Sequence, residues 1–137
     1  MKLPRPTDTL AGCIWLPRIL EKARLLASGR LPAEYAGRFC QPSSVDSEFL
    51  TFFGLSREDI VRAAGLADEE AALWFASLPS AGDVQIAAWN HVAVNLGRPG
   101  FPLADRLPVG LSTTYRHLSA RNLETVFSVL EADEEAP

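Results

Sequence analysis

One short predicted helix near the N-terminus carries an unusual combination of side chains that could bind an anion. Arg18 and Lys22 lie on it, and Trp15 shortly precedes it; Arg18 and Lys22 are four residues apart, which places them on one face of a helix. Two cations at this spacing repel each other by about 0.2–0.5 kcal/mol. We therefore expect a negative group to face them, either an internal carboxylate or a phosphate or carboxylate ligand.

Three carboxylates are near enough in sequence to be that negative group: Glu21, Glu34 and Asp46. Glu34 and Asp46 stand on either side of the segment 35–41, which reads as a connection. We expect this connection to fold over the helix and at least one carboxylate to contact Arg18, because a planar guanidinium can hold a carboxylate with two hydrogen bonds. Asp46 also stands three residues after Ser43, which loosely fits a helix-capping pair.

The same residues allow two interpretations. If both cations are satisfied internally, the cluster is a structural clasp. If Lys22 faces a cavity together with Tyr35 or His91, it is an anion-binding site, in which Tyr35, Asp46 or His91 could transfer protons. Two ordinary alternatives remain open, a solvated basic helix face and a histidine that is simply satisfied within the core.

Cys40 follows Tyr35 in the same connection and has two interpretations as well. Beside a cation, its thiol pKa would fall and it could act as a nucleophile. A lone cysteine is more often a small buried apolar side chain. The remaining cysteine, Cys13, and the second histidine, His117, are isolated in the sequence.

No motif for metal or cofactor chemistry accompanies these residues. The sequence lacks Cys-x-x-Cys and His-Glu-x-x-His pairs, so no metal site is expected. It also lacks a phosphate-binding loop, a dinucleotide fingerprint and a nucleophile elbow, so no cofactor is expected.

Composition narrows the class of protein. The 137 residues are enough for one domain, 47% of them are hydrophobic, and the net charge is −4. This acidic balance argues against nucleic-acid binding, which needs a basic face. We expect no signal peptide, and because no apolar stretch of about 18 residues occurs, no membrane span is expected either. Two cysteines do not make a disulfide scaffold, and we expect a cytoplasmic protein with reduced thiols.

The pattern of caps, apolar stripes and stop residues predicts an all-α fold. We expect an irregular compact bundle of five to seven short helices in a single domain spanning residues 1–137. The clearest helices are expected at 17–28, 44–53 and 83–96, and the last one at 120–132. The helix at 83–96 is apolar most of the way round, which is typical of a central helix.

Two segments should be irregular. Residues 98–111 hold three prolines and two glycines and should form a loop that could cover the bundle. Residues 131–137 are rich in acidic side chains and should form a frayed tail.

The sequence resembles a family of small bacterial helical proteins known as domain of unknown function 5069. The resemblance is strongest in the run from Leu10 to Arg24, LAGCIWLPRILEKAR, and in Gly29, Glu34-Tyr35, Cys40 and the run from Phe49 to Leu55, FLTFFGL. The closing run from Arg121 to Glu134 is also similar, and residues 98–117 are less so. The resemblance implies a compact helical domain and supplies neither an activity nor catalytic residues.

Two functions are compatible with these patterns. The first is a binding or accessory protein for a small anionic metabolite or a protein partner. The alternative is a small cofactor-independent enzyme that grips an anionic substrate with Arg18 and Lys22. Because chemical motifs are lacking, the sequence favours the first.

Overall fold

The computed structural model describes residues 2–135, and its fold is mostly helical, which confirms the predicted fold class. The chain divides into two compact units, Met1–Asn90 and His91–Pro137. None of the described helices is long and apolar enough to cross a lipid bilayer.

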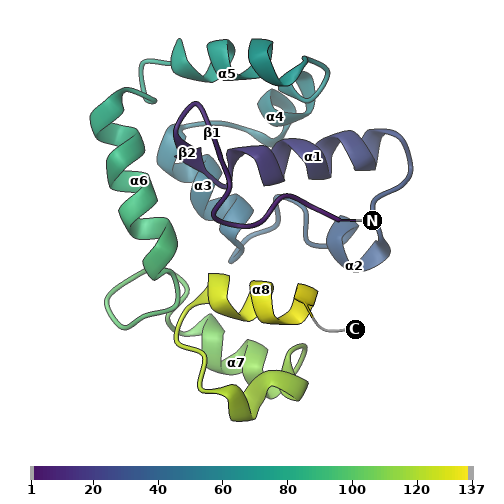
Figure 1. The fold of residues 1–137 in the computed structure, drawn as a ribbon, viewed down its shortest axis with the longest axis vertical. Helices are drawn as coiled ribbons and strands as arrows, with labels where there is room; N and C mark the ends of the chain where they lie inside the picture. Colours follow the sequence, from purple (N-terminus) through teal and green to yellow (C-terminus); the bar gives the residue numbers. More distant parts are fainter. Residues whose placement is uncertain (1, 136–137) are drawn as a thin grey trace. The chain divides into compact units, whose positions relative to one another are not determined.

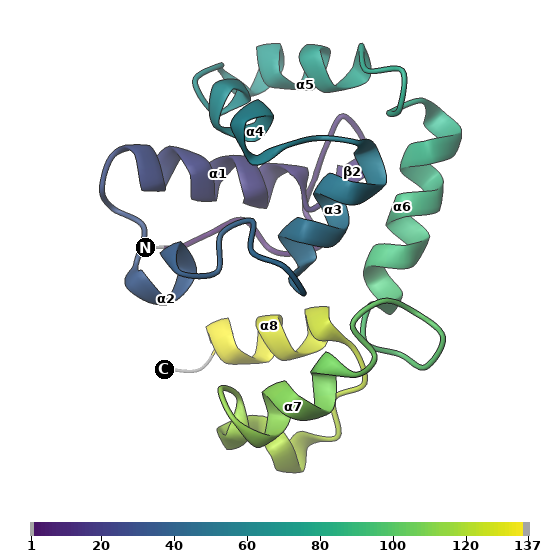
Figure 2. The same ribbon diagram turned by 180° about the vertical axis from the view of Figure 1, so that it is seen from behind.

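The first unit contains a small hairpin and most of the helices (Figure 1). In chain order these elements are β1 (Thr9–Leu10), β2 (Cys13–Ile14), α1 (Leu16–Ala27), α2 (Ala33–Ala36), α3 (Val45–Phe53), α4 (Arg57–Ala63), α5 (Asp68–Ala76) and the greater part of α6 (Asp83–Asn95). Helix α1 packs against β1, α2 and α4. Seen from both sides, α4 lies between α1 and α5 (Figures 1 and 2).

The second unit continues from α6 into α7 (Arg106–Ser112), the 3-10 helix η1 (Arg116–Arg121) and α8 (Val126–Glu135). Its core contains Leu118, Val129 and Ala132, against which half-buried Leu107, Leu111, Tyr115 and Leu123 pack. With α2, α7 and η1, the described residues form eight α-helices and one 3-10 helix, which is more than the five to seven expected.

Local signals explain several helix boundaries. Ser44 caps α3 by accepting a hydrogen bond from the Ser47 amide, and Gly54 ends α3 with a φ of 65°, a value that glycine adopts without strain. Ser56 and Asp59 form a complete capping box at the start of α4. The expected cap of α3, Ser43 paired with Asp46, is wrong by one residue, because Ser44 takes that role.

The hairpin is an unexpected element, because the sequence predicts an all-α fold. Its strands pair antiparallel, with Thr9 opposite Ile14 and Leu10 opposite Cys13. The two loop residues, Ala11 and Gly12, have φ values of 54° and 74°, as the tightest hairpin turns require.

The core of the first unit is aromatic. The ring centroids of Phe49 and Phe53 lie 5.1 Å apart, those of Phe53 and Phe75 5.0 Å apart, and those of Phe49 and Trp89 5.5 Å apart. The apolar positions of the predicted helices indicate which side chains should form the core, and most of them are buried, namely Ile19, Leu20, Ala23, Phe49, Leu50, Phe53 and Phe127. Four others expected there are only half-buried: Trp74, Val92, Leu123 and Leu130.

Three further expectations differ from the structure. Helix α6 is not buried all round. It buries Trp89 and Ala93, but Val84, Ala87 and Ala88 are exposed. Part of the predicted loop 98–111 is helical, since α7 begins at Arg106; Pro108 falls in its first turn, where a missing N–H costs no hydrogen bond.

The last helix starts later than residue 120, because Asn122 adopts a left-handed φ of 59° after η1. Thr125 then accepts a hydrogen bond from the Ser128 amide as α8 begins. The acidic residues from Glu131 to Glu135 belong to α8, and residues 136–137 lie outside the described residues.

Candidate functional site

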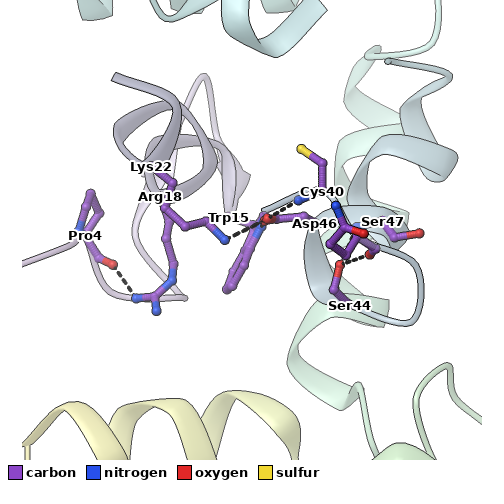
Figure 3. A network of polar contacts seen from close by, with 9 residues as sticks. Pro4, Trp15, Arg18, Lys22, Cys40, Ser44, Asp46 and Ser47 are labelled. Carbon is purple, nitrogen blue, oxygen red and sulfur yellow. Dashed lines mark hydrogen bonds and ion pairs between the residues drawn. The ribbon is translucent and has the colours of Figure 1, made fainter. Parts of the chain in front are cut away.

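Lys22 and Asp46 form a buried ion pair between α1 and α3 (Figure 3). The Lys22 Nζ atom lies 2.7 Å from Oδ1 and 2.9 Å from Oδ2 of Asp46. Only 7% of Lys22 and 2% of Asp46 is exposed to solvent. Asp46, one of the three candidate carboxylates, is therefore the counter-charge of Lys22.

Two further donors complete the hydrogen bonding of Asp46. The indole Nε1 of Trp15 donates to Oδ1 at 2.8 Å, and the backbone amide of Cys40 donates to Oδ2 at 3.0 Å. Each carboxylate oxygen thus accepts two hydrogen bonds from inside the protein. A buried carboxylate is tolerated when its lone pairs are satisfied in this way.

The indole ring of Trp15 makes cation–π contacts with both Arg18 and Lys22. The Lys22 Nζ atom lies 4.8 Å from the ring centroid, and the Arg18 Cζ atom lies 5.2 Å from it. Cations at this range are attracted to the negative face of the ring. Arg18 is also buried, and its Nη1 donates to the backbone carbonyl of Pro4 at 2.9 Å. We call Trp15, Arg18, Lys22 and Asp46 the clasp.

Unusual backbone conformations bring the clasp together. Trp15 precedes α1 with a left-handed φ of 78°, and Cys40 and Ser43 have φ values of 58° and 60°. Such values are uncommon for residues other than glycine and mark sharply turned backbone. The predicted fold of the connection over α1 is confirmed, because α2 packs on α1 and the Cys40 amide reaches Asp46.

Burial governs the protonation of the clasp and of the neighbouring thiol. Burial lowers the pKa of Lys22, and the adjacent Asp46 carboxylate partly offsets this shift because it favours the charged ammonium. Burial, together with the Asp46 charge, raises the pKa of Cys40 to about 12. A raised pKa keeps the thiol neutral near pH 7 and argues against an activated Cys40 nucleophile. A nearby cation does not outweigh burial and a nearby carboxylate.

The structure places the other two predicted site residues on α2 and α6. Tyr35 is half-buried on α2. His91 is exposed on α6 at the start of the second unit, where its ring centroid lies 5.8 Å from that of Phe101. Phe101 comes from the loop that was expected to pack over helices. His91 is thus not the satisfied core histidine of the ordinary interpretation.

Sequence patterns missed the backbone groups that complete the clasp, the Cys40 amide and the Pro4 carbonyl. Main-chain donors and acceptors occur at almost every position, so no residue type marks them. Among the described residues, no three His, Cys, Asp or Glu side chains are placed to hold a metal ion.

A second feature is a set of exposed apolar and acidic side chains on α5 and α6. Leu73 is 73% exposed and Val84 is 79% exposed. Glu69 and Glu70 precede Leu73 by four and three residues, which places them on the same side of α5. No lysine or arginine occurs from Ala63 to Gly97. We call Glu69, Glu70, Leu73, Asp83, Val84, Ala87 and Ala88 the α5–α6 face.

The fold and the clasp define a small, mostly helical protein whose buried polar cluster is closed to solvent. Comparison with protein families shows that the chain belongs to the family described as domain of unknown function, DUF5069, which matches residues 2–136. The comparisons with curated proteins and with solved structures find no match.

Proposed function

We propose that this protein is a non-enzymatic binding or accessory protein in the cytoplasm that engages a protein partner through the α5–α6 face. The exposure of Leu73 and Val84 carries the proposal, because large apolar side chains that are more than two-thirds exposed gain most from being covered. Both cysteines are free thiols, which suits a reducing compartment.

The charges of this face favour one kind of partner. The acidic Glu69, Glu70 and Asp83 flank the apolar residues, and no cation lies between Ala63 and Gly97. A helix or segment that carries lysine or arginine beside apolar side chains complements this surface. An acidic partner would be repelled.

The clasp supports the binding function over the enzymatic alternative. An enzyme that uses Arg18 and Lys22 to grip an anionic substrate, with Tyr35, Asp46 or His91 moving protons, requires an ammonium group open to the substrate. The Lys22 ammonium instead lies within 3 Å of both Asp46 oxygens in a buried setting. We therefore assign the clasp a structural role.

The test uses a synthetic 18-residue helical peptide with leucines on one face and lysines on the other. We expect this peptide to bind the full chain and to shift the amide resonances of α5 and α6. Serine at both Leu73 and Val84 should weaken binding by about thirtyfold, because two apolar contacts of roughly 1 kcal/mol each are lost. Both positions are exposed, so the fold should be unaffected.

Two controls make the test specific. Val109→Ser removes a side chain that is 44% exposed on α7 and should leave the affinity unchanged. A peptide with glutamate in place of lysine should not bind. Equal affinity of the double serine variant and the parent chain would overturn the proposal.

A further inference from the structure

A second site, separate from both the clasp and the α5–α6 face, lies along α1. An open pocket of about 430 Å³ is lined by Lys2, Leu3, Pro4, Pro17, Glu21, Arg24 and Asp68. The α1 residues in this lining are spaced by four and three positions, so they share one face of the helix. The volume falls within the range of about 300–1,000 Å³ that is typical of small-molecule sites.

Two of the four charged groups in the pocket neutralise each other. Arg24 Nη1 lies 2.9 Å from the Asp68 carboxylate, and Arg24 also donates to the carbonyls of Ala64 and Leu66, at 3.1 Å each. This network ties α1 to the end of α4 and the start of α5. Arg24 and Asp68 therefore form a fixed wall of the pocket rather than groups that await a ligand.

The other two charges keep capacity for a ligand. The Glu21 carboxylate forms only a loose ion pair with Arg24, whose Nη1 atom lies 3.7 Å away and beyond hydrogen-bond distance, and the Glu21 side chain is 37% exposed. Lys2 is exposed, and within residues 2–135 its ammonium group has neither an ion pair nor a hydrogen bond. The pocket thus offers one ammonium and one carboxylate, beside the apolar side chains of Leu3, Pro4 and Pro17.

We propose that this pocket binds a small zwitterion, an α-amino acid with an apolar side chain. The ligand's carboxylate would pair with Lys2 and its ammonium group with Glu21, while its side chain covers the apolar lining. A simple anion would meet the carboxylates of Glu21 and Asp68, and a simple cation would meet Lys2 and Arg24. Only a ligand with both charges is attracted at both ends.

The clasp is linked to this pocket through Pro4. Pro4 lines the pocket, and its carbonyl accepts a hydrogen bond from buried Arg18 at 2.9 Å. Arg18 thereby holds the N-terminal segment against α1. It is a positioning residue for the pocket and does not touch the ligand.

The experiment titrates the full chain with L-leucine and with its two halves, 3-methylbutylamine and 4-methylpentanoate, and follows backbone amide resonances. We expect leucine to give saturable shifts at Glu21, Arg24 and Asp68. Each half should bind about tenfold more weakly, because it loses one charge-assisted hydrogen bond of roughly 1.5 kcal/mol. No saturable shift at these amides, or equal binding of 4-methylpentanoate and leucine, would overturn the proposal.

Matched variants test the two charges separately. Lys2→Gln and Glu21→Gln should each weaken leucine binding by about tenfold, since each removes one end of the recognition. Arg30→Gln and Glu34→Gln change exposed charges outside the pocket and should leave binding unchanged. Equal affinity of all four variants would show that the pocket charges do not bind the ligand. None of these results depends on the α5–α6 face.

Discussion

Asp46 is the residue on which the buried polar structure of the first unit depends. Removing a carboxylate from water is costly unless hydrogen bonds and an opposite charge replace the lost hydration. Asp46 receives both, from Lys22, Trp15 and the Cys40 amide. Because these donors come from two separate segments, the carboxylate ties the start of α1 and the connection before α3 to α3 itself.

Removing one partner of the buried pair should be strongly destabilising. In Lys22→Met, the Asp46 carboxylate stays buried without its counter-charge, so we expect the free energy of unfolding to fall by about 3–5 kcal/mol. Urea denaturation at pH 7 measures this. Lys2→Met removes an exposed lysine and should change stability by less than about 0.5 kcal/mol.

A double variant separates the cost of a broken pair from the worth of the intact pair. Lys22→Met combined with Asp46→Leu buries no charge and should regain much of the lost stability, because apolar replacement of a buried pair is often close to neutral. If Lys22→Met alone costs less than about 1 kcal/mol, water reaches Asp46 and the clasp is not closed.

The two thiols should be unreactive in the folded chain. Burial raises the pKa of Cys13 to about 12, and the pKa of Cys40 is also raised to about 12. Only the thiolate reacts with iodoacetamide, so alkylation at pH 8 should be slow for the native protein and fast in urea. Rapid native alkylation of Cys40 would contradict a buried, neutral thiol.

The same thiols make stability depend on alkaline pH. As pH rises through 9.0, the usual thiol pKa, the unfolded chain loses protons that the folded chain retains. The free energy of unfolding should therefore fall from about pH 9 upward. Urea titrations of the parent and of Cys13→Ala with Cys40→Ala, at pH 8 and pH 10, measure this contribution, which the variant should lack.

The sequence indicates which residues form the clasp, but it does not indicate which cation pairs with Asp46. The repulsion expected between Arg18 and Lys22 indicates a carboxylate nearby, and one of the three candidates, Asp46, pairs with Lys22. The sequence favoured Arg18 as the partner on general geometry, whereas the turned backbone at Cys40 and Ser43 delivers Asp46 to Lys22. That a carboxylate contacts Arg18 stays a prediction.

At the scale of elements, the hairpin shows what periodicity cannot predict. Each strand has two residues, which is too short for an alternating pattern to be recognised. Its support comes from α6, far along the chain. Asn90 accepts from the Ile14 amide at 3.0 Å and donates to the Gly12 carbonyl at 2.9 Å, and Trp89 Nε1 donates to the Ile14 carbonyl.

Replacing Asn90 should loosen this hairpin. Asn90→Ala leaves the Ile14 amide and the Gly12 carbonyl without these partners, which should cost about 1–3 kcal/mol of stability. Hydrogen exchange at the Ile14 amide should accelerate. Asn95→Ala is the matched control, because the Asn95 side chain donates only to the His91 carbonyl one turn earlier in α6. Equal effects of the two substitutions would show that Asn90 does not hold the hairpin.

The aromatic core allows a sharp comparison within one helix. Phe53 is 1% exposed and its neighbour Phe52 is 37% exposed. Phe53→Ala should cost about 3–5 kcal/mol, from lost burial plus the cavity it leaves. Phe52→Ala should cost clearly less in the same urea titration. A loss below roughly 1 kcal/mol for Phe53→Ala would contradict its burial among the rings of α3, α5 and α6.

Helix starts were predictable where a side chain marks them, as at the capping box of α4. Burial is harder to predict for small apolar side chains, because they occur both in cores and on protein surfaces. The many apolar side chains of α6 indicated a central helix, but alanine and valine are small enough to remain exposed at little cost. Composition alone does not reveal which face of such a helix is covered.

At the scale of the whole molecule, the two units differ in what holds them together. The first combines the clasp, the hairpin contacts and an aromatic core. The second has the small cluster of Leu118, Val129 and Ala132, with an exposed pair between His117 and Asp133 at 2.9 Å joining η1 to α8. A segment of fewer than about 50 residues buries a small share of its surface and is correspondingly marginal.

We therefore expect the second unit to open more readily than the first. Native-state hydrogen exchange over a series of urea concentrations reports the opening free energy of each amide. Amides of α7, η1 and α8 should open at least about 2 kcal/mol more easily than those of α1 and α3, because fewer apolar side chains are buried around them. Leu118→Ala should lower the opening free energies of the amides in α7, η1 and α8 and leave those of α1 and α3 unchanged. One common opening free energy for all of these helices would contradict this prediction. It would show that the whole chain unfolds in a single cooperative step.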